Sequence, residues 1–326
     1  MEPRLPTYDD VLAAANRLGA LAVRTPLIEH PILNDRAGGR VLLKLETLQR
    51  VGSFKFRGAF NAISQIDPAR FPGGVVACSS GNHAQGVAAA AMMCGMDSLI
   101  VMPRDAPELK IARTKRYGAE VVTYDRETED RDAIAQTLCA ERNAAFIPPF
   151  DHFDVITGQG TVGLELMQQA EAMNAIPDAV LAPCSGGGLV SGVALAVKHA
   201  NATTEVYSAE PEDFDDMARS LASRRRERNE KMSGSICDAL LVATPGELTF
   251  ALAKQLLAGG TVVSDDEVRA AVRFAFEELK LVVEPGGAAA LAAILSGKVP
   301  AFGRTVACVL SGGNIDPALF SEIIGA

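Results

Sequence analysis

The chain has 326 residues, and its 31 basic and 40 acidic residues give a formal net charge of -9. Because nucleic-acid-binding proteins carry a basic footprint, this charge argues against a nucleic-acid partner and favours a small-molecule ligand. The hydrophobic content of 48% is enough to bury the cores of two domains that share a cleft. The chain lacks a run of about 18 apolar residues and an apolar signal peptide, so we expect no membrane contact and a cytoplasmic location.

From residue 74 onward, short apolar runs alternate with longer segments of helical period, a pattern typical of parallel strands joined by helices. We first expect strands at 75–78, 98–102 and 120–124, and helices near 82–94, 107–117 and 128–142. Two prolines at 148–149 interrupt the alternation, which resumes with strands expected at 179–182, 205–209 and 304–310. The sequence predicts an α/β fold with a small domain, 74–149, inserted into a large domain formed by 1–73 and 150–326.

A lysine between two phenylalanines marks the segment 53–59, S-F-K-F-R-G-A. A lysine condenses with an aldehyde only through its neutral amine, and apolar neighbours such as Phe54 and Phe56 favour that form by penalising the ammonium. Taken alone, Lys55 could also be a surface lysine on a half-buried segment. The interpretation of Lys55 therefore depends on two glycine-rich segments further along the chain.

The first glycine-rich segment consists of Ser185, Gly186, Gly187, Gly188 and Leu189. It follows an expected strand and opens an expected helix, so its successive backbone N–H groups can form an anion site that fits a monophosphate. A flexible turn is the alternative. A nicotinamide cofactor is disfavoured, because the pattern G-x-G-x-x-G with an acidic residue about 20 positions later is not matched.

The second segment, 79–86, reads S-S-G-N-H-A-Q-G and stands at the same kind of strand-to-helix junction. Its amides can bind a carboxylate, and its polar side chains project toward the bound molecule. A helix cap is the alternative. A third junction, S-G-G-N, begins at Ser311. Because ligands collect at the carboxyl ends of strands in α/β sheets, we expect the three loops to converge on one crevice.

These motifs occur in order over most of the chain and together resemble the fold-type II pyridoxal-phosphate enzymes. The similarity is to the branch that contains the serine/threonine dehydratases and serine racemases, because S-S-G-N-H differs from the S-G-N-T of the cysteine synthases. The resemblance implies two lobes, each a three-layer αβα arrangement with mostly parallel sheets, as in the β subunit of tryptophan synthase. It also implies a small amino-acid substrate and a homodimer.

The resemblance implies that Lys55 bonds covalently to pyridoxal 5'-phosphate, with Phe54 beside it. Asn82 would bond the 3'-oxygen of the cofactor ring, and Ser311 would face the pyridine nitrogen. The five residues 185–189, already named, would hold the cofactor phosphate through their amides.

The substrate α-carboxylate would be bound by four neighbouring residues: Ser79, Ser80, Asn82 and His83. Arg131 is similar to an arginine that contacts the substrate in serine racemase, although a surface salt bridge is an equal alternative within its run of charges. Ser80 also matches the racemase residue that exchanges a proton on the opposite face of the substrate.

An acidic segment, 210–216, resembles the divalent-cation site of serine racemase. The match implies that Glu210 and Asp216 supply carboxylates and that Phe214 supplies its backbone carbonyl. Such hard oxygen ligands suit magnesium or calcium. Without the resemblance, this segment would be interpreted as a solvated turn.

The function implied is β-elimination from L-threonine, L-serine or a related 3-hydroxy amino acid such as 3-hydroxyaspartate, with release of a 2-oxo acid and ammonia. Racemisation of serine or aspartate, alone or together with elimination, is the first alternative. A β-replacement reaction is disfavoured by His83. A binding or sensor protein on the same fold is the non-enzymatic alternative.

Overall fold

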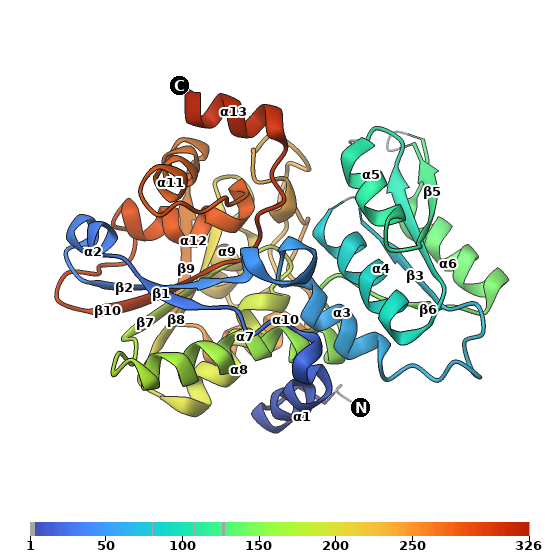
Figure 1. Ribbon diagram of the computed structural model, residues 1–326, viewed down its shortest axis with the longest axis horizontal. Helices are drawn as coiled ribbons and strands as arrows, with labels where there is room; N and C mark the ends of the chain where they lie inside the picture. The colour runs from blue at the N-terminus through green and yellow to red at the C-terminus, as the bar shows by residue number, and fades with distance from the viewer. Residues whose placement is uncertain (1–3, 80, 107, 126–127, 326) are drawn as a thin grey trace.

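The computed structural model describes residues 4–79, 81–106, 108–125 and 128–325. It contains two β-sheets with helices packed on both faces of each (Figure 1). The strands are β1 (Leu27–Glu29), β2 (Arg40–Leu45), β3 (Val75–Cys78), β4 (Ser98–Pro103), β5 (Glu120–Tyr124), β6 (Ala145–Phe146), β7 (Ala179–Pro183), β8 (Glu205–Pro211), β9 (Gly259–Val263) and β10 (Thr305–Leu310).

The α-helices alternate with these strands over most of the chain. They are α1 (Tyr8–Leu18), α2 (Pro31–Ala37), α3 (Lys55–Ile63), α4 (Asn82–Cys94), α5 (Glu108–Lys115), α6 (Arg131–Arg142), α7 (Phe153–Ala172), α8 (Gly188–Ala200), α9 (Asp216–Ser223), α10 (Glu247–Leu256), α11 (Asp265–Glu277), α12 (Pro285–Leu295) and α13 (Pro317–Gly325). Short 3-10 turns are η1 (Gly19–Leu21), η2 (Glu46–Leu48), η3 (Arg50–Gly52) and η4 (Asp238–Leu240).

The larger sheet has the strand order β1-β2-β10-β7-β8-β9, and its pairs are parallel except for antiparallel β1 and β2. Successive strand residues face opposite layers, since Leu42 and Val180 pack with α7 and α8 whereas Leu43 and Leu181 pack with α11 and α12. Figure 1 shows the sheet between these two helix pairs. The neighbouring strands β7 and β10 therefore end at the same edge.

The smaller sheet has the order β5-β4-β3-β6 and is parallel throughout. Val75 and Ala77 pack with α3 and α4 on one face, and Val76 packs with Ala135 of α6 on the other. Each sheet therefore lies between two helical layers, which confirms the predicted two-lobed αβα fold with mostly parallel sheets. The boundaries at 73/74 and 149/150 stay a prediction.

Helix α3 packs against α4 and against α7, so it lies between the two sheets' helical layers (Figure 1). Because α3 begins at Lys55, this lysine stands where elements of both lobes meet. In the described part of the chain, none of the helices has the length and apolarity needed to cross a bilayer.

Candidate active site

Two of the three predicted loops, those after β3 and β10, meet near the start of α3. Ser53 forms an antiparallel bridge with Gly312, and the backbone N–H of Phe54 donates to the Ser311 carbonyl at 3.1 Å. Asn314 donates from Nδ2 to Oδ1 of Asn82 at 2.7 Å. The lysine segment, the asparagine loop after β3 and the loop after β10 are therefore in direct contact.

Lys55 is the first residue of α3, and its Nζ donates a hydrogen bond to the Pro149 carbonyl at 2.6 Å. The ring of Phe54 lies 5.3 Å from Nζ, whereas Phe56 packs against Phe60 in the core. Desolvation by the surrounding protein lowers the pKa of Lys55 to about 8. A sizeable fraction of this amine is therefore neutral near physiological pH, as a nucleophilic lysine requires.

The glycine loop between β7 and α8 is shaped by close packing. Gly187 has φ 94° and caps α8, so it adopts a conformation that favours glycine. A Cβ atom on Gly186 would lie 2.3 Å from the Phe150 ring, and one on Gly187 would lie 2.6 Å from Cε of Met217. Side chains are therefore excluded here, and the first N–H groups of α8 remain free of intrahelical acceptors, which suits a bound phosphate.

A segment that the sequence analysis missed supports this loop. The Asp151 carboxylate accepts from the backbone N–H groups of Glu247, Leu248 and Thr249 at 2.8–3.2 Å, which caps α10. Thr249 in turn donates from Oγ1 to the Gly186 carbonyl at 2.6 Å. Residues 149–151 therefore hold the lysine, the glycine loop and α10 in one arrangement.

The loop after β3 carries the predicted substrate contacts, of which Ser80 lies outside the described residues. Ser79 accepts a hydrogen bond at Oγ from the Gly81 N–H at 3.1 Å. His83 is 3% exposed, and its Nε2 lies 2.9 Å from the Ile147 carbonyl, so this nitrogen carries the proton. Desolvation and the charge of Lys55 lower the pKa of His83 to about 3, so the imidazole is neutral and only Nδ1 can accept.

Two further predicted residues lie at the margins of this loop. Ser311 is 5% exposed and donates its backbone N–H to the Gly287 carbonyl at 3.3 Å, which holds it against α12. Arg131 begins α6, and its backbone carbonyl accepts from the Cys78 thiol at 3.4 Å. The Arg131 side chain is 55% exposed and lies 3.6 Å from Asp132.

Glu284 is a site residue that the sequence analysis also missed. It is 5% exposed, precedes α12 and accepts at Oε1 from Asn82 Nδ2 at 2.5 Å. Burial and the charge of Asp238 raise its pKa to about 7, against the opposing effects of Asn82 and Lys110. An acidic residue immediately before Pro-Gly-Gly was the only sequence signal available.

The acidic segment places two buried carboxylates between β8 and α9. Glu210 accepts from the Met217 N–H at 2.8 Å, and Asp216 accepts at Oδ1 from Asn229 Nδ2 at 2.7 Å. Oδ2 of Asp216 is buried and has no hydrogen-bond partner among the described residues. Burial raises the pKa of Asp216 to about 6, while burial and Asp216 raise that of Glu210 well above its ordinary value.

Phe214 is buried in the turn between these carboxylates. Within the described part of the chain, no group of three or more His, Cys, Asp or Glu side chains could hold a metal ion. A cation at this place would therefore need backbone carbonyl and water ligands besides Glu210 and Asp216. The orphaned Asp216 oxygen fits such an ion.

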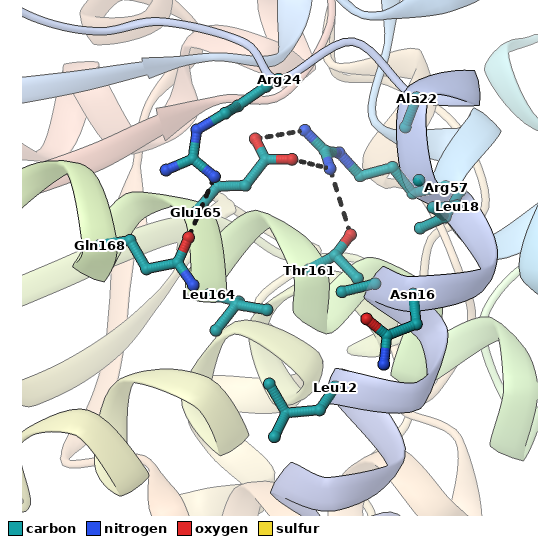
Figure 2. A pocket seen from close by; sticks show the side chains of 12 residues that line it. Leu12, Asn16, Leu18, Ala22, Arg24, Arg57, Thr161, Leu164, Glu165 and Gln168 are labelled. Atoms are coloured by element: carbon teal, nitrogen blue, oxygen red, sulfur yellow. Dashed lines mark hydrogen bonds and ion pairs between the residues drawn. The ribbon is translucent and has the colours of Figure 1, made fainter.

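A network of buried charges lies on the other side of α3. Arg57 makes paired hydrogen bonds to Glu46 at 2.8 Å and to Glu165 at 2.7 and 2.9 Å. Figure 2 shows Arg57, Glu165 and Thr161 beside a cavity of about 300 Å³ between α1 and α7. Because neither Lys55 nor the glycine loop lines this cavity, it is not the predicted crevice.

The residues gathered around Lys55 fit pyridoxal 5'-phosphate. The desolvated amine suits an aldehyde, and the glycine loop at the start of α8 is closed to any Cβ by Phe150 and Met217. These features are joined through Pro149 and Asp151 into one site.

Comparisons with known proteins agree with this geometry. The chain is 41% identical to the L-threo-3-hydroxyaspartate ammonia-lyase of Saccharomyces cerevisiae, with 98% of this chain and 97% of that protein covered. It is 39% identical to the catabolic L-threonine dehydratase of Escherichia coli, with 97% and 95% covered. It is 38% identical to the serine racemase of Schizosaccharomyces pombe, with 98% of each covered.

Solved structures give the same result. The T.th. threonine deaminase matches with a TM-score of 0.90 and 44% identity over 95% of this chain and 99% of that one. Maize serine racemase matches with a TM-score of 0.92 and 35% identity over 98% and 97%. A family profile described as pyridoxal-phosphate dependent enzyme matches residues 20–312. The chain therefore belongs to the family of pyridoxal-phosphate-dependent enzymes.

Proposed function

We propose that the protein is an ammonia-lyase that converts a 3-hydroxy amino acid to a 2-oxo acid and ammonia. The observation that carries the proposal is the lysine at the head of α3, whose pKa is lowered to about 8 and whose Nζ is held by Pro149. L-threo-3-hydroxyaspartate and L-threonine are the substrates to test first, since relatives at 41% and 39% identity bear those names.

The cofactor, when bound, supplies an electron sink for the electrons left on the substrate Cα when its proton is removed. Lys55 would hold the cofactor aldehyde, residues 185–189 its phosphate, Asn82 its 3'-oxygen, and Ser311 its pyridine nitrogen. Lys55 Nζ can accept the Cα proton, because desolvation keeps part of the amine neutral near neutral pH. The Ser311 hydroxyl is uncharged, so it would not stabilise a protonated ring nitrogen as a carboxylate does.

For the substrate carboxylate we propose the loop 79–83 at the start of α4. The N–H groups of a helix N-terminus favour an anion, and Asn82 and His83 begin that helix. The neutral His83 would contribute Nδ1 as an acceptor and no charge. Ser80 stays a prediction. Arg131 could contribute a charge only if its exposed side chain left Asp132.

Racemisation of the same amino acids is the second candidate function, because serine racemases match over the whole chain. The homodimer and the cytoplasmic location stay predictions.

The proposal is tested with purified protein supplied with pyridoxal 5'-phosphate. We expect 2-oxo acid and ammonia from L-threo-3-hydroxyaspartate or L-threonine, and a loss of at least about a thousandfold in turnover for Lys55→Ala. Lys298→Ala, a change at an exposed lysine, is the control and should keep full activity. Appearance of the opposite enantiomer without 2-oxo acid would favour the racemase, and an active Lys55→Ala variant would refute the assignment.

We also propose a magnesium or calcium ion at Glu210, Asp216 and the Phe214 carbonyl, supported by the unpartnered Asp216 oxygen. Magnesium at a hundred times its dissociation constant should stabilise the fold by about 2.7 kcal/mol, because it binds only the folded state. Thermal unfolding with magnesium or with EDTA measures this effect. Asp216→Asn should abolish it, whereas Asp213→Asn, an exposed change in the same turn, should keep it; equal stabilisation of both variants would exclude the site.

A further inference from the structure

The amide of Asn82 is held at both ends by residues from the other lobe. Its Nδ2 donates to Oε1 of Glu284 at 2.5 Å, and its Oδ1 accepts from Nδ2 of Asn314 at 2.7 Å. Glu284 and Asn314 lie 202 and 232 positions away in sequence. The orientation of the Asn82 amide is therefore determined by residues that are distant in sequence.

The orientation of Asn314 is fixed independently. Its Nδ2 also donates to the Val51 carbonyl at 2.7 Å, and its Oδ1 accepts from Nη1 of Arg113 at 3.3 Å. A carbonyl can only accept and a guanidinium can only donate, so the Asn314 amide has one satisfied orientation. It therefore presents a donor to Asn82.

Glu284 imposes the same orientation from the opposite side. An ionised carboxylate has no donor, so above its pKa of about 7 Glu284 requires Nδ2 of Asn82 to face it, whereas Asn314 imposes this orientation independently of pH. The Glu284 backbone is held beside the loop after β10, because its N–H donates to the Gly312 carbonyl at 3.0 Å. If the Asn82 amide were turned over, oxygen would face the carboxylate and nitrogen would face the Asn314 donor.

We propose that Glu284 and Asn314 are positioning residues that fix the Asn82 amide so that its second N–H, and not its oxygen, is available to the cofactor ring. Nδ2 carries two hydrogens, and Glu284 uses one of them, which leaves one donor. A donor favours the anionic form of a ring oxygen, whereas an acceptor would repel it. The inference rests on the proposed function, since it concerns the group that Asn82 would bind there.

Asn314→Asp provides the sharpest test, because it keeps the size of the side chain and reverses its hydrogen-bonding role toward Asn82. An aspartate cannot donate to Asn82 Oδ1, so it favours the overturned amide. We expect a shifted visible absorption band of the bound cofactor and an affinity for pyridoxal 5'-phosphate weakened by about tenfold, the change expected for one hydrogen bond to a charged group. Both are measured by titrating the cofactor-free protein.

Glu284→Gln is the matched conservative variant, because its amide oxygen can still accept from Asn82 Nδ2. Its affinity should stay within about threefold of the natural protein. Glu284→Ala should weaken the affinity by less than Asn314→Asp does, because Asn82 loses one partner while Asn314 still donates to its Oδ1. Asp238 lies near Glu284 and accepts a hydrogen bond from Lys110, not from Asn82. Asp238→Asn removes this charge and should leave the absorption band of the bound cofactor unshifted. Urea unfolding of the cofactor-free variants distinguishes a general loss of structure from a local change at Asn82. If Asn314→Asp is unfolded, Glu284→Ala takes its place in the test.

An unshifted band and an unchanged affinity in both Asn314→Asp and Glu284→Ala would overturn the inference. Failure of the natural protein to bind pyridoxal 5'-phosphate through Lys55 would instead overturn the proposed function. Covalent attachment at Lys55, detected by mass spectrometry after reduction with borohydride, distinguishes the two results.

Discussion

Two lysines of this chain illustrate how neighbouring charges change the effect of burial on the pKa of an amine. Lys44 is fully buried in β2, and desolvation lowers its pKa, but Glu165 at 2.7 Å and Glu46 oppose this effect and favour the charged form. For Lys55, desolvation lowers the pKa with no opposing effect from a carboxylate, and its Nζ donates a hydrogen bond to a neutral carbonyl. The neighbouring charges, and not burial alone, therefore suit Lys55 to nucleophilic chemistry.

The lowered pKa of Lys55 predicts how cofactor attachment depends on pH. Only the neutral amine attacks an aldehyde, so the attachment rate should rise with pH and level off above a midpoint near 8. Stopped-flow absorbance after mixing cofactor-free protein with pyridoxal 5'-phosphate measures this rate. Lys55→Ala supplies the background from other amines. A midpoint near 10.5, the ordinary value for lysine, would contradict the desolvated environment.

At the scale of elements, the glycine loop depends on parts that are distant in sequence. β7 delivers it, α8 begins within it, and the segment 149–151 packs against it and caps α10. Because Thr249 of α10 also donates to the Gly186 carbonyl, the loop is supported from both sides. Packing and hydrogen bonds from three elements therefore constrain the three consecutive glycines.

This packing predicts the effect of adding one methyl group. A Cβ on Gly186 would lie 2.3 Å from Phe150, so Gly186→Ala should displace that ring and its neighbour Pro149, with a destabilisation of about 1–3 kcal/mol. The affinity for pyridoxal 5'-phosphate should fall as well. Urea unfolding and cofactor titration measure the two effects. Gly259→Ala is the control, since its Cβ would meet Tyr207 at an ordinary 3.6 Å; equal behaviour of both variants would argue against a packed cradle.

At the scale of the whole molecule, the sequence predicted the fold because strand and helix periods are local patterns. The strands expected at 75–78 and 120–124 have those bounds in the structure, and the helix expected near 82–94 is α4. Strand β2 was not predicted, because Arg40 and Lys44 interrupt its apolar run. The partner that allows Lys44 to be buried, Glu165, lies 121 positions further along the chain.

The motifs of the candidate site are also visible in the sequence because they are local. Residues 53–59, 79–83 and 185–189 are recognisable as short motifs, and the structure brings the described ones together. The residues that hold them, including Asp151 and Glu284, act through contacts 96 and 202 positions apart. Such partners have no local pattern, so only tertiary structure reveals them.

The central place of β10 also has a consequence for synthesis of the protein. This strand is the last one among the described residues, yet it lies between β2 and β7, and its end supplies Ser311 beside Phe54. On the ribosome, β3 to β6 emerge together and can pair early, whereas the larger sheet has a gap at its middle until residues 305–310 leave the exit tunnel. We therefore expect the vitamin-derived cofactor to be acquired only after residues 305–310 have left the exit tunnel.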